Sequence, residues 1–146
     1  MKQPGVLVIL LTFVAAVSFV VASEQYKHGR NKTTTLTGFA EVPTIGDPDG
    51  TGILKFSIGV EENQICYELS VSNIGTPTAA EISFGSKTEV GTVIATLEAP
   101  ANGSSKRCVT LAADKIADLI KNPGHYYVNV YNAEFPKGAI RGQLGN

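Results

Sequence analysis

The sequence is short of the residues that carry metal and redox chemistry. Its 146 residues include two histidines and two cysteines. It contains no Ser/His/Asp constellation, no glycine-rich phosphate loop after a strand and no Cys-x-x-Cys motif. These absences remove the common signatures of catalysis, so we expect neither an enzyme nor a bound cofactor.

The sequence also lacks an excess of charge of either sign. Lys and Arg number 12 and Asp and Glu number 13, which leaves a formal net charge of −1. Nucleic acids and anionic membrane surfaces attract proteins with a strong positive charge. Neither is therefore expected as a partner.

The one long apolar run lies at the N-terminus, over residues 6–21. Small residues follow it, and Val20 and Ala22 occupy the positions that signal peptidase reads before a cut after Ala22. We therefore interpret residues 1–22 as a signal peptide and expect a secreted or periplasmic protein with no membrane attachment after cleavage. The alternative is an N-terminal membrane anchor, although the run is slightly shorter than the roughly 20 residues that a spanning helix needs.

Residues 35–146 have the sequence pattern of a single β-domain. A polar leader, which we assign to residues 23–34, precedes it. Short alternating runs are separated by turn residues every few positions, which is typical of an antiparallel sandwich or barrel. The spacing changes to a helical period between Ala112 and Asn122. The strand-like runs cover residues 33–40, 53–60, 65–71, 79–85, 91–97, 105–111, 126–132 and 138–144. We therefore predict an all-β domain of about eight strands with one short helix.

Cys66 and Cys108 both follow the export signal, and in an oxidising compartment such a pair predicts one disulfide. The alternation of their strands places both sulfurs on the less apolar face, so the two side chains can meet if the strands are neighbours. The bridge would stabilise the domain by about 2–4 kcal/mol. The alternative is a pair of buried free thiols.

Six blocks of the sequence resemble the CHRD domain, a module found in chordin and in secreted microbial and plant proteins. The resemblance covers about residues 35–144. It implies a Greek-key-like β-sandwich and an extracellular location, but no settled activity. The blocks are GFAEVP (38–43), GTG (50–52), CYEL (66–69), TAAEISFG (78–85), the run from NP to YYVNV (122–130) and FPKGAIRGQL (135–144).

The chain departs from this family at the positions of its usual histidines. Typical members of the CHRD family, which this chain resembles, carry His-x-His where it has Glu81 and Ser83, and a further His where it has Tyr131. Histidines so placed would form a transition-metal site. A carboxylate, a hydroxyl and a phenol are poor substitutes, and His28 and His125 lie elsewhere. We therefore expect no metal.

Glu41 and Arg141 form the most notable charged pair in the sequence. Arg141 lies in the middle of the last strand-like run, and Glu41 lies at the end of the first. We interpret them as a structural ion pair that fixes how the first and last strands meet. The alternative is a polar recognition site.

Glu81, Ser83, Asn129 and Tyr131 would share a solvent-facing patch if their strands pair. The simpler interpretation is an ordinary polar sheet face. The functional one is a ligand surface, because aromatic rings beside polar groups bind sugars and peptides. The partner would then be an extracellular protein or a glycan.

Together these observations predict a secreted, non-catalytic extracellular or envelope module with a binding or structural role. The alternative is an extracellular transition-metal-binding or redox-protective protein, by analogy with relatives that keep their histidines. Asn31 and Asn102 begin N-glycosylation sequons in segments that we expect to be exposed.

Overall fold

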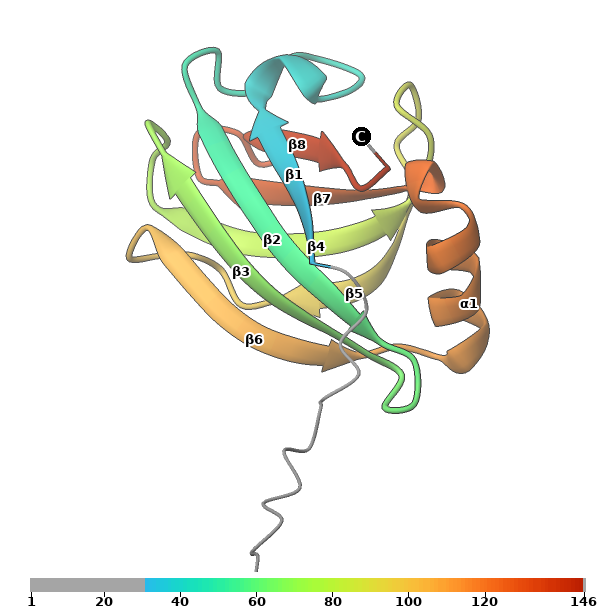
Figure 1. The fold of residues 1–146 in the computed structure, drawn as a ribbon. Coiled ribbons are helices and arrows are strands. Elements are labelled where there is room, and N and C mark those ends of the chain that lie inside the picture. Colours follow the sequence, from blue (N-terminus) through green and yellow to red (C-terminus); the bar gives the residue numbers. More distant parts are fainter. Residues whose placement is uncertain (1–30, 146) are drawn as a thin grey trace, which may run out of the picture.

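The computed structural model describes residues 31–145, which form eight β-strands and one short α-helix (Figure 1). Two single-turn 3₁₀ segments, η1 and η2, precede β2 and β7. The elements are β1 (Lys32–Thr37), η1 (Gly38–Ala40), β2 (Thr51–Gly59), β3 (Gln64–Ser72), β4 (Pro77–Phe84), β5 (Thr92–Leu97), β6 (Ser104–Thr110), α1 (Ala113–Lys121), η2 (Pro123–His125), β7 (Tyr126–Asn132) and β8 (Ile140–Gln143).

All eight strands belong to one antiparallel sheet in the order β5-β4-β7-β8-β1-β2-β3-β6. The sheet curls until its two edge strands, β5 and β6, approach each other, so that it almost closes into a barrel (Figure 1). The two layers expected of a sandwich are therefore two halves of one continuous sheet. The predicted all-β architecture with about eight strands and one helix is confirmed.

The hydrophobic core lies between these two halves. In β2, Leu54, Phe56 and Ile58 point inward, and the same alternation in β3 buries Ile65 and Leu69. The two strands pair in register along their whole length as a hairpin. Burying each large apolar side chain contributes about 1.5–3 kcal/mol, so this alternation determines which face of the sheet turns inward.

Helix α1 follows the pattern of its sequence. Ile116 and Leu119 occupy one face of the helix and are buried against the core. The helix ends at Lys121, before Asn122 and Pro123, because proline cannot continue it. Within the described residues, no helix has the length and apolarity needed to cross a bilayer.

The start of the domain corrects one boundary. β1 begins at Lys32, so the last three residues assigned to the leader belong to the sheet. The threonine-rich sequence explains this result, because β-branched residues suit a strand. The proposed signal peptide (1–22) and residues 23–30 lie outside the described residues. Asn31 and Asn102 are both exposed, as expected.

Candidate functional site

Strand β7 divides its side chains between two different environments. Val128 and Val130 point into the hydrophobic core, whereas Tyr127, Asn129 and Tyr131 alternate with them and point to the opposite face. Successive side chains of a strand take opposite faces, so this division follows from the sequence. The second face is polar, yet Tyr127 and Asn129 are also buried.

The neighbouring strands extend this buried polar face on both sides of β7. Glu81 of β4 lies opposite Asn129, and Arg141 of β8 lies opposite it on the other side. Ser83 and Gln143 lie two residues further along these two strands. We call the following set the polar layer: Glu41, Glu81, Ser83, Tyr127, Asn129, Tyr131, Arg141 and Gln143.

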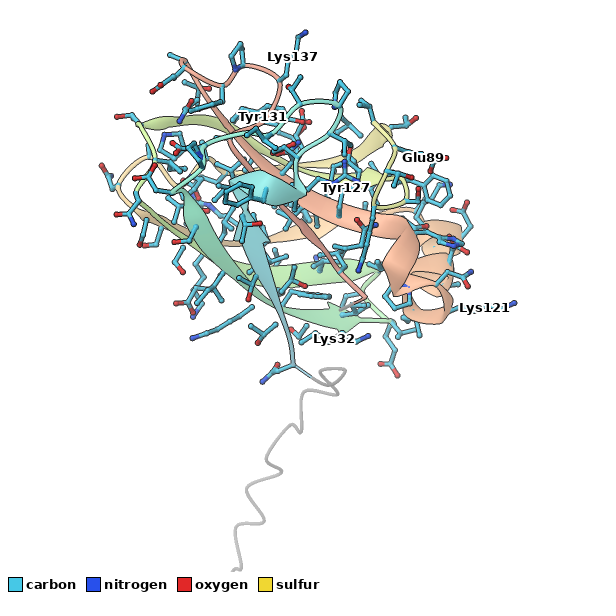
Figure 2. All side chains as sticks on the ribbon, turned by 90° about the horizontal axis from the view of Figure 1, so that it is seen from above. Lys32, Glu89, Lys121, Tyr127, Tyr131 and Lys137 are labelled. Atoms are coloured by element: carbon cyan, nitrogen blue, oxygen red, sulfur yellow. A yellow bond between two sulfur atoms is a disulfide. The ribbon has the colours of Figure 1, made fainter. Side chains whose placement is uncertain are left out.

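Two loop segments, residues 38–50 and 85–91, connect to the polar layer and its strands. Asp47 N donates to Ala139 O at 2.8 Å, which ties the first segment to the start of β8. Gly91 N donates to the Tyr127 hydroxyl at 3.1 Å, which ties down the second. Figure 2 looks onto this side of the molecule, with Tyr131 and Tyr127 along β7 and Glu89 toward the Tyr127 end.

Arg141 holds the second segment through its guanidinium group. Its Nη1 donates to Glu89 O at 2.9 Å, and its Nη2 donates to Ser86 O at 2.6 Å. The guanidinium carbon also stacks 3.5 Å from the centroid of the Tyr127 ring. Burial lowers the pKa of Arg141, but a guanidinium remains charged at neutral pH. The side chain therefore anchors a loop from within the protein.

Glu41 and Arg141 do not form the direct ion pair predicted from the sequence. Both are buried, with exposed fractions of 4% and 2%. The salt bridge found within residues 31–145 joins Arg107 to Glu98 instead. The reason is that the guanidinium of Arg141 is used by the two loop carbonyls, so it acts on Glu41 only as a nearby charge.

The partner of Glu41 is Asn129, whose Nδ2 donates to Glu41 Oε2 at 3.3 Å. Glu41 Oε1 and Asn129 Oδ1 are buried and have no hydrogen-bond partner within residues 31–145. Burial raises the pKa of Glu41 to about 7, although the charge of Arg141 and the Asn129 bond lower it. Protonation would turn one oxygen of Glu41 into a donor, which suits a buried site whose unpartnered side-chain atoms are both acceptors.

The predicted patch of Glu81, Ser83, Asn129 and Tyr131 lies on one face, but only Glu81 and Tyr131 reach solvent there. Ser83 and Asn129 are buried, at 1% and 4% exposure, and the other two are half-buried. Tyr131 donates its hydroxyl to Glu81 Oε2 at 3.0 Å. The expectation of a solvent-facing patch failed for Ser83 and Asn129, because strand alternation reports which face a side chain takes, not whether other segments cover that face.

The donor set in this region does not suit a transition metal. Burial and the charge of Glu81 raise the pKa of Tyr131, so its side chain stays a phenol and uses its proton to bond that carboxylate. The amide of Asn129 is bonded to Glu41. Zinc and copper favour imidazole and thiolate ligands. Among the residues that the structure describes, no three His, Cys, Asp or Glu side chains gather as a metal-binding group.

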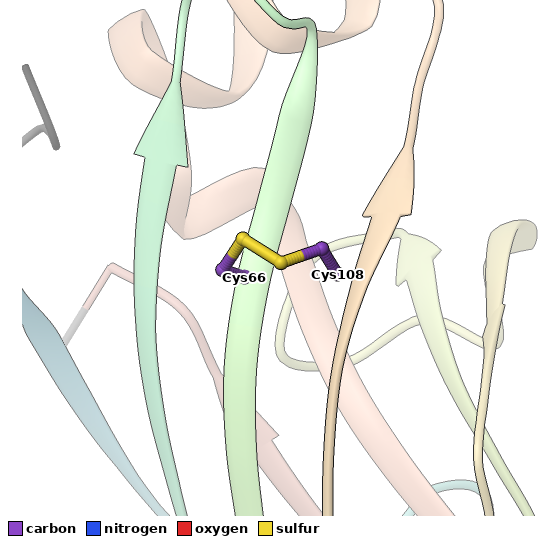
Figure 3. The surroundings of a disulfide bond; sticks show 2 residues. All are labelled: Cys66 and Cys108. Atoms are coloured by element: carbon purple, nitrogen blue, oxygen red, sulfur yellow. A yellow bond between two sulfur atoms is a disulfide. The ribbon is translucent and has the colours of Figure 1, made fainter. Parts of the chain in front are cut away.

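The disulfide lies on the opposite half of the sheet. Cys66 of β3 and Cys108 of β6 are directly opposed in register, and their sulfurs are bonded (Figure 3). Both side chains are on the outer face, with Cys108 exposed. The predicted pairing and its face are confirmed, and the bridge joins an edge strand to its neighbour.

The chain belongs to the CHRD domain family, whose model matches residues 32–144. This match covers nearly all of the described chain and confirms the resemblance drawn from the sequence. Membership supports an extracellular binding module as the general role. Comparisons with curated proteins and with solved structures gave no match.

Sequence reasoning missed two residues of this region, Gln143 in the polar layer and Gly138 beside it. Gln143 was not singled out, although it lies two residues from Arg141 on its strand and so shares its face. The same alternation that placed the cysteines would have found it. Gly138 was missed because its role is spatial: a side chain there would collide with the Glu41 carboxylate.

Proposed function

We propose that this protein is an exported, non-catalytic module that binds an extracellular protein or glycan or serves a structural role outside the cell. The observation that carries the proposal is the internal bonding of the polar layer. Tyr131 bonds Glu81, Asn129 bonds Glu41, and Arg141 bonds backbone carbonyls. Groups committed to one another are poor candidates for nucleophiles, general bases or metal ligands.

The disulfide supports the proposed compartment. Disulfides persist in oxidising environments and are rare in the cytosol. Cys108 is exposed, so reducing agents in a cytosol would have access to the bridge. Export through residues 1–22 would place the chain where this bond survives. Mass spectrometry of the protein extracted from whole cells together with their medium should give an N-terminus at Ser23, and retention of residues 1–22 would favour a membrane anchor instead.

Calorimetric titration with copper and zinc tests the non-metal role against the alternative of a metal-binding or redox-protective protein. We expect no saturable binding to the native chain. The double variant Glu81→His with Tyr131→His serves as the positive control, because those side chains already meet across neighbouring strands. Two imidazoles there would offer the ligands that copper and zinc prefer. Tight one-to-one binding by the native chain would refute the proposal.

A further inference from the structure

The two edges of the curled sheet face each other without pairing. Within residues 31–145, β5 pairs with β4 and β6 pairs with β3, and neither strand has a second neighbour. Edge strands carry a row of free N–H and C=O groups that can pair with another chain. The two strands lie close near their connecting loop and diverge toward α1 (Figure 1). We call this opening the β5–β6 seam.

The wide end of the seam holds a cavity of about 510 Å³, between the start of β5, the end of β6 and the first turn of α1. Its walls include Phe84, Val93, Ile94 and Leu111. Phe84 and Val93 remain 43% and 47% exposed. Grouped exposed apolar side chains at the rim of a core are typical of an interaction site.

The two edges differ in how well they are protected. β6 carries Lys106 and Arg107, and Arg107 is held by Glu98 at 2.7 Å. Charged side chains are a usual protection against edge pairing. β5 has the sequence TVIATL, with no charged residue and no proline. The edge of β5 is therefore the one open to an incoming strand.

We propose that the β5–β6 seam binds an extended peptide segment of a partner protein, which pairs with β5 and places an apolar side chain in the cavity and an acidic one at Lys115. Only another backbone matches alternating N–H and C=O groups, which argues for a peptide over a lipid or a sugar. Lys115 is the one charged residue among the described cavity walls, and its ammonium lies 6.0 Å from the Phe84 ring centroid.

A second copy of the chain fits the seam less well than a single peptide strand. The two edges face each other across the seam (Figure 1), so a second barrel that brought its own edge strand to β5 would meet β6. One extended segment needs only the width of a strand. This inference rests on the proposed function and names its partner as a protein with an exposed extended segment.

The test uses the full mature chain and three labelled peptides in fluorescence anisotropy. The first peptide alternates valine and threonine and ends in aspartate, the second ends in lysine, and the third has proline at alternate positions. We expect the aspartate peptide to bind and the proline peptide to fail, because proline removes the N–H groups of the ladder.

A charge reversal on the protein makes the test specific. Lys115→Glu should lower the affinity for the aspartate peptide by about tenfold and raise the affinity for the lysine peptide. Lys121→Glu, on the same helix but outside the cavity walls, should leave both affinities unchanged. Both lysines are exposed, so neither substitution threatens folding.

Failure of the aspartate peptide to bind, equal binding of the proline peptide, or equal effects of the two charge reversals would overturn the proposal. A dimer of the native chain that Val93→Lys abolishes would assign the seam to a second copy and overturn it as well. If an extracellular protein binds the native chain and the Val93→Lys variant with equal affinity, the β5–β6 seam is not the binding site, whereas the proposed function stands. Tight metal binding without any macromolecular partner would overturn both.

Discussion

Replacing Glu41 with glutamine separates two accounts of this buried carboxyl group. If Glu41 is a neutral acid paired with Asn129, it needs its proton in the folded state. If it is an ion pair with Arg141, as the sequence suggested, it needs to lose that proton. Glutamine keeps the shape of the side chain and cannot titrate, so the difference in stability between the two proteins isolates the ionisation of Glu41.

The magnitude follows from the pKa of Glu41, which burial raises from 4.5 to about 7. A folded-state pKa above the unfolded value means that the folded protein binds the proton more tightly. The resulting stability is fully present below pH 4.5 and is lost as the pH rises through about 7. The total change is about 3 kcal/mol, with a slope of up to about 1.4 kcal/mol per pH unit.

Urea unfolding of the native chain and of Glu41→Gln at a series of pH values measures this change. The native chain should lose about 3 kcal/mol relative to the variant between acidic and mildly basic pH. The difference cancels the titration of all other groups. If the difference in unfolding free energy does not change with pH, Glu41 has an ordinary pKa. If the native chain instead gains stability relative to the variant as the pH rises, the ion pair with Arg141 is the correct account.

Three further predictions concern the stability of the fold. Arg141→Lys should cost about 2–3 kcal/mol, because lysine replaces two separate nitrogens with one and has no planar group to stack on the tyrosine ring. Unchanged urea unfolding would refute this. Gly138→Ala should cost about 2 kcal/mol or more, because its φ is +136° and a methyl group there would meet the Glu41 carboxylate. The control is Gly124→Ala, whose methyl group would meet nothing within 4 Å. Equal melting temperatures of the two variants would contradict the prediction. Replacing Cys66 and Cys108 with serine should lower the free energy of unfolding by about 4 kcal/mol. A loss of less than about 1 kcal/mol in urea unfolding would show that the disulfide contributes little to stability.

Local periodicity made much of the fold predictable. Alternation over residues 53–60 identified β2 and its buried face, because sheet phase depends on neighbouring residues alone. The same alternation put Cys66 and Cys108 on the outer face before their pairing was known. The helical period before Asn122 identified α1 for the same reason.

The candidate site was less predictable because it depends on contacts distant in sequence. Opposite charges suggested that Glu41 and Arg141 pair, but the guanidinium donates to the carbonyls of Ser86 and Glu89 instead. No pattern in the sequence predicts that this loop lies beside Arg141. Asn129 was assigned to the right face, yet its burial depends on segments that fold over it. Polar residues on a strand therefore indicate a face, and tertiary packing decides its exposure.

The metal content of the exported protein tests the central claim most directly, namely that the side chains of the polar layer bond one another or the backbone of nearby loops and hold no transition metal. The chain would be recovered from cells grown with copper and zinc, dialysed without chelator and analysed by mass spectrometry of its elements. We expect far less than one equivalent of either metal per chain. One equivalent of copper or zinc, displaced by substitution of Glu81 or Tyr131, would contradict the account.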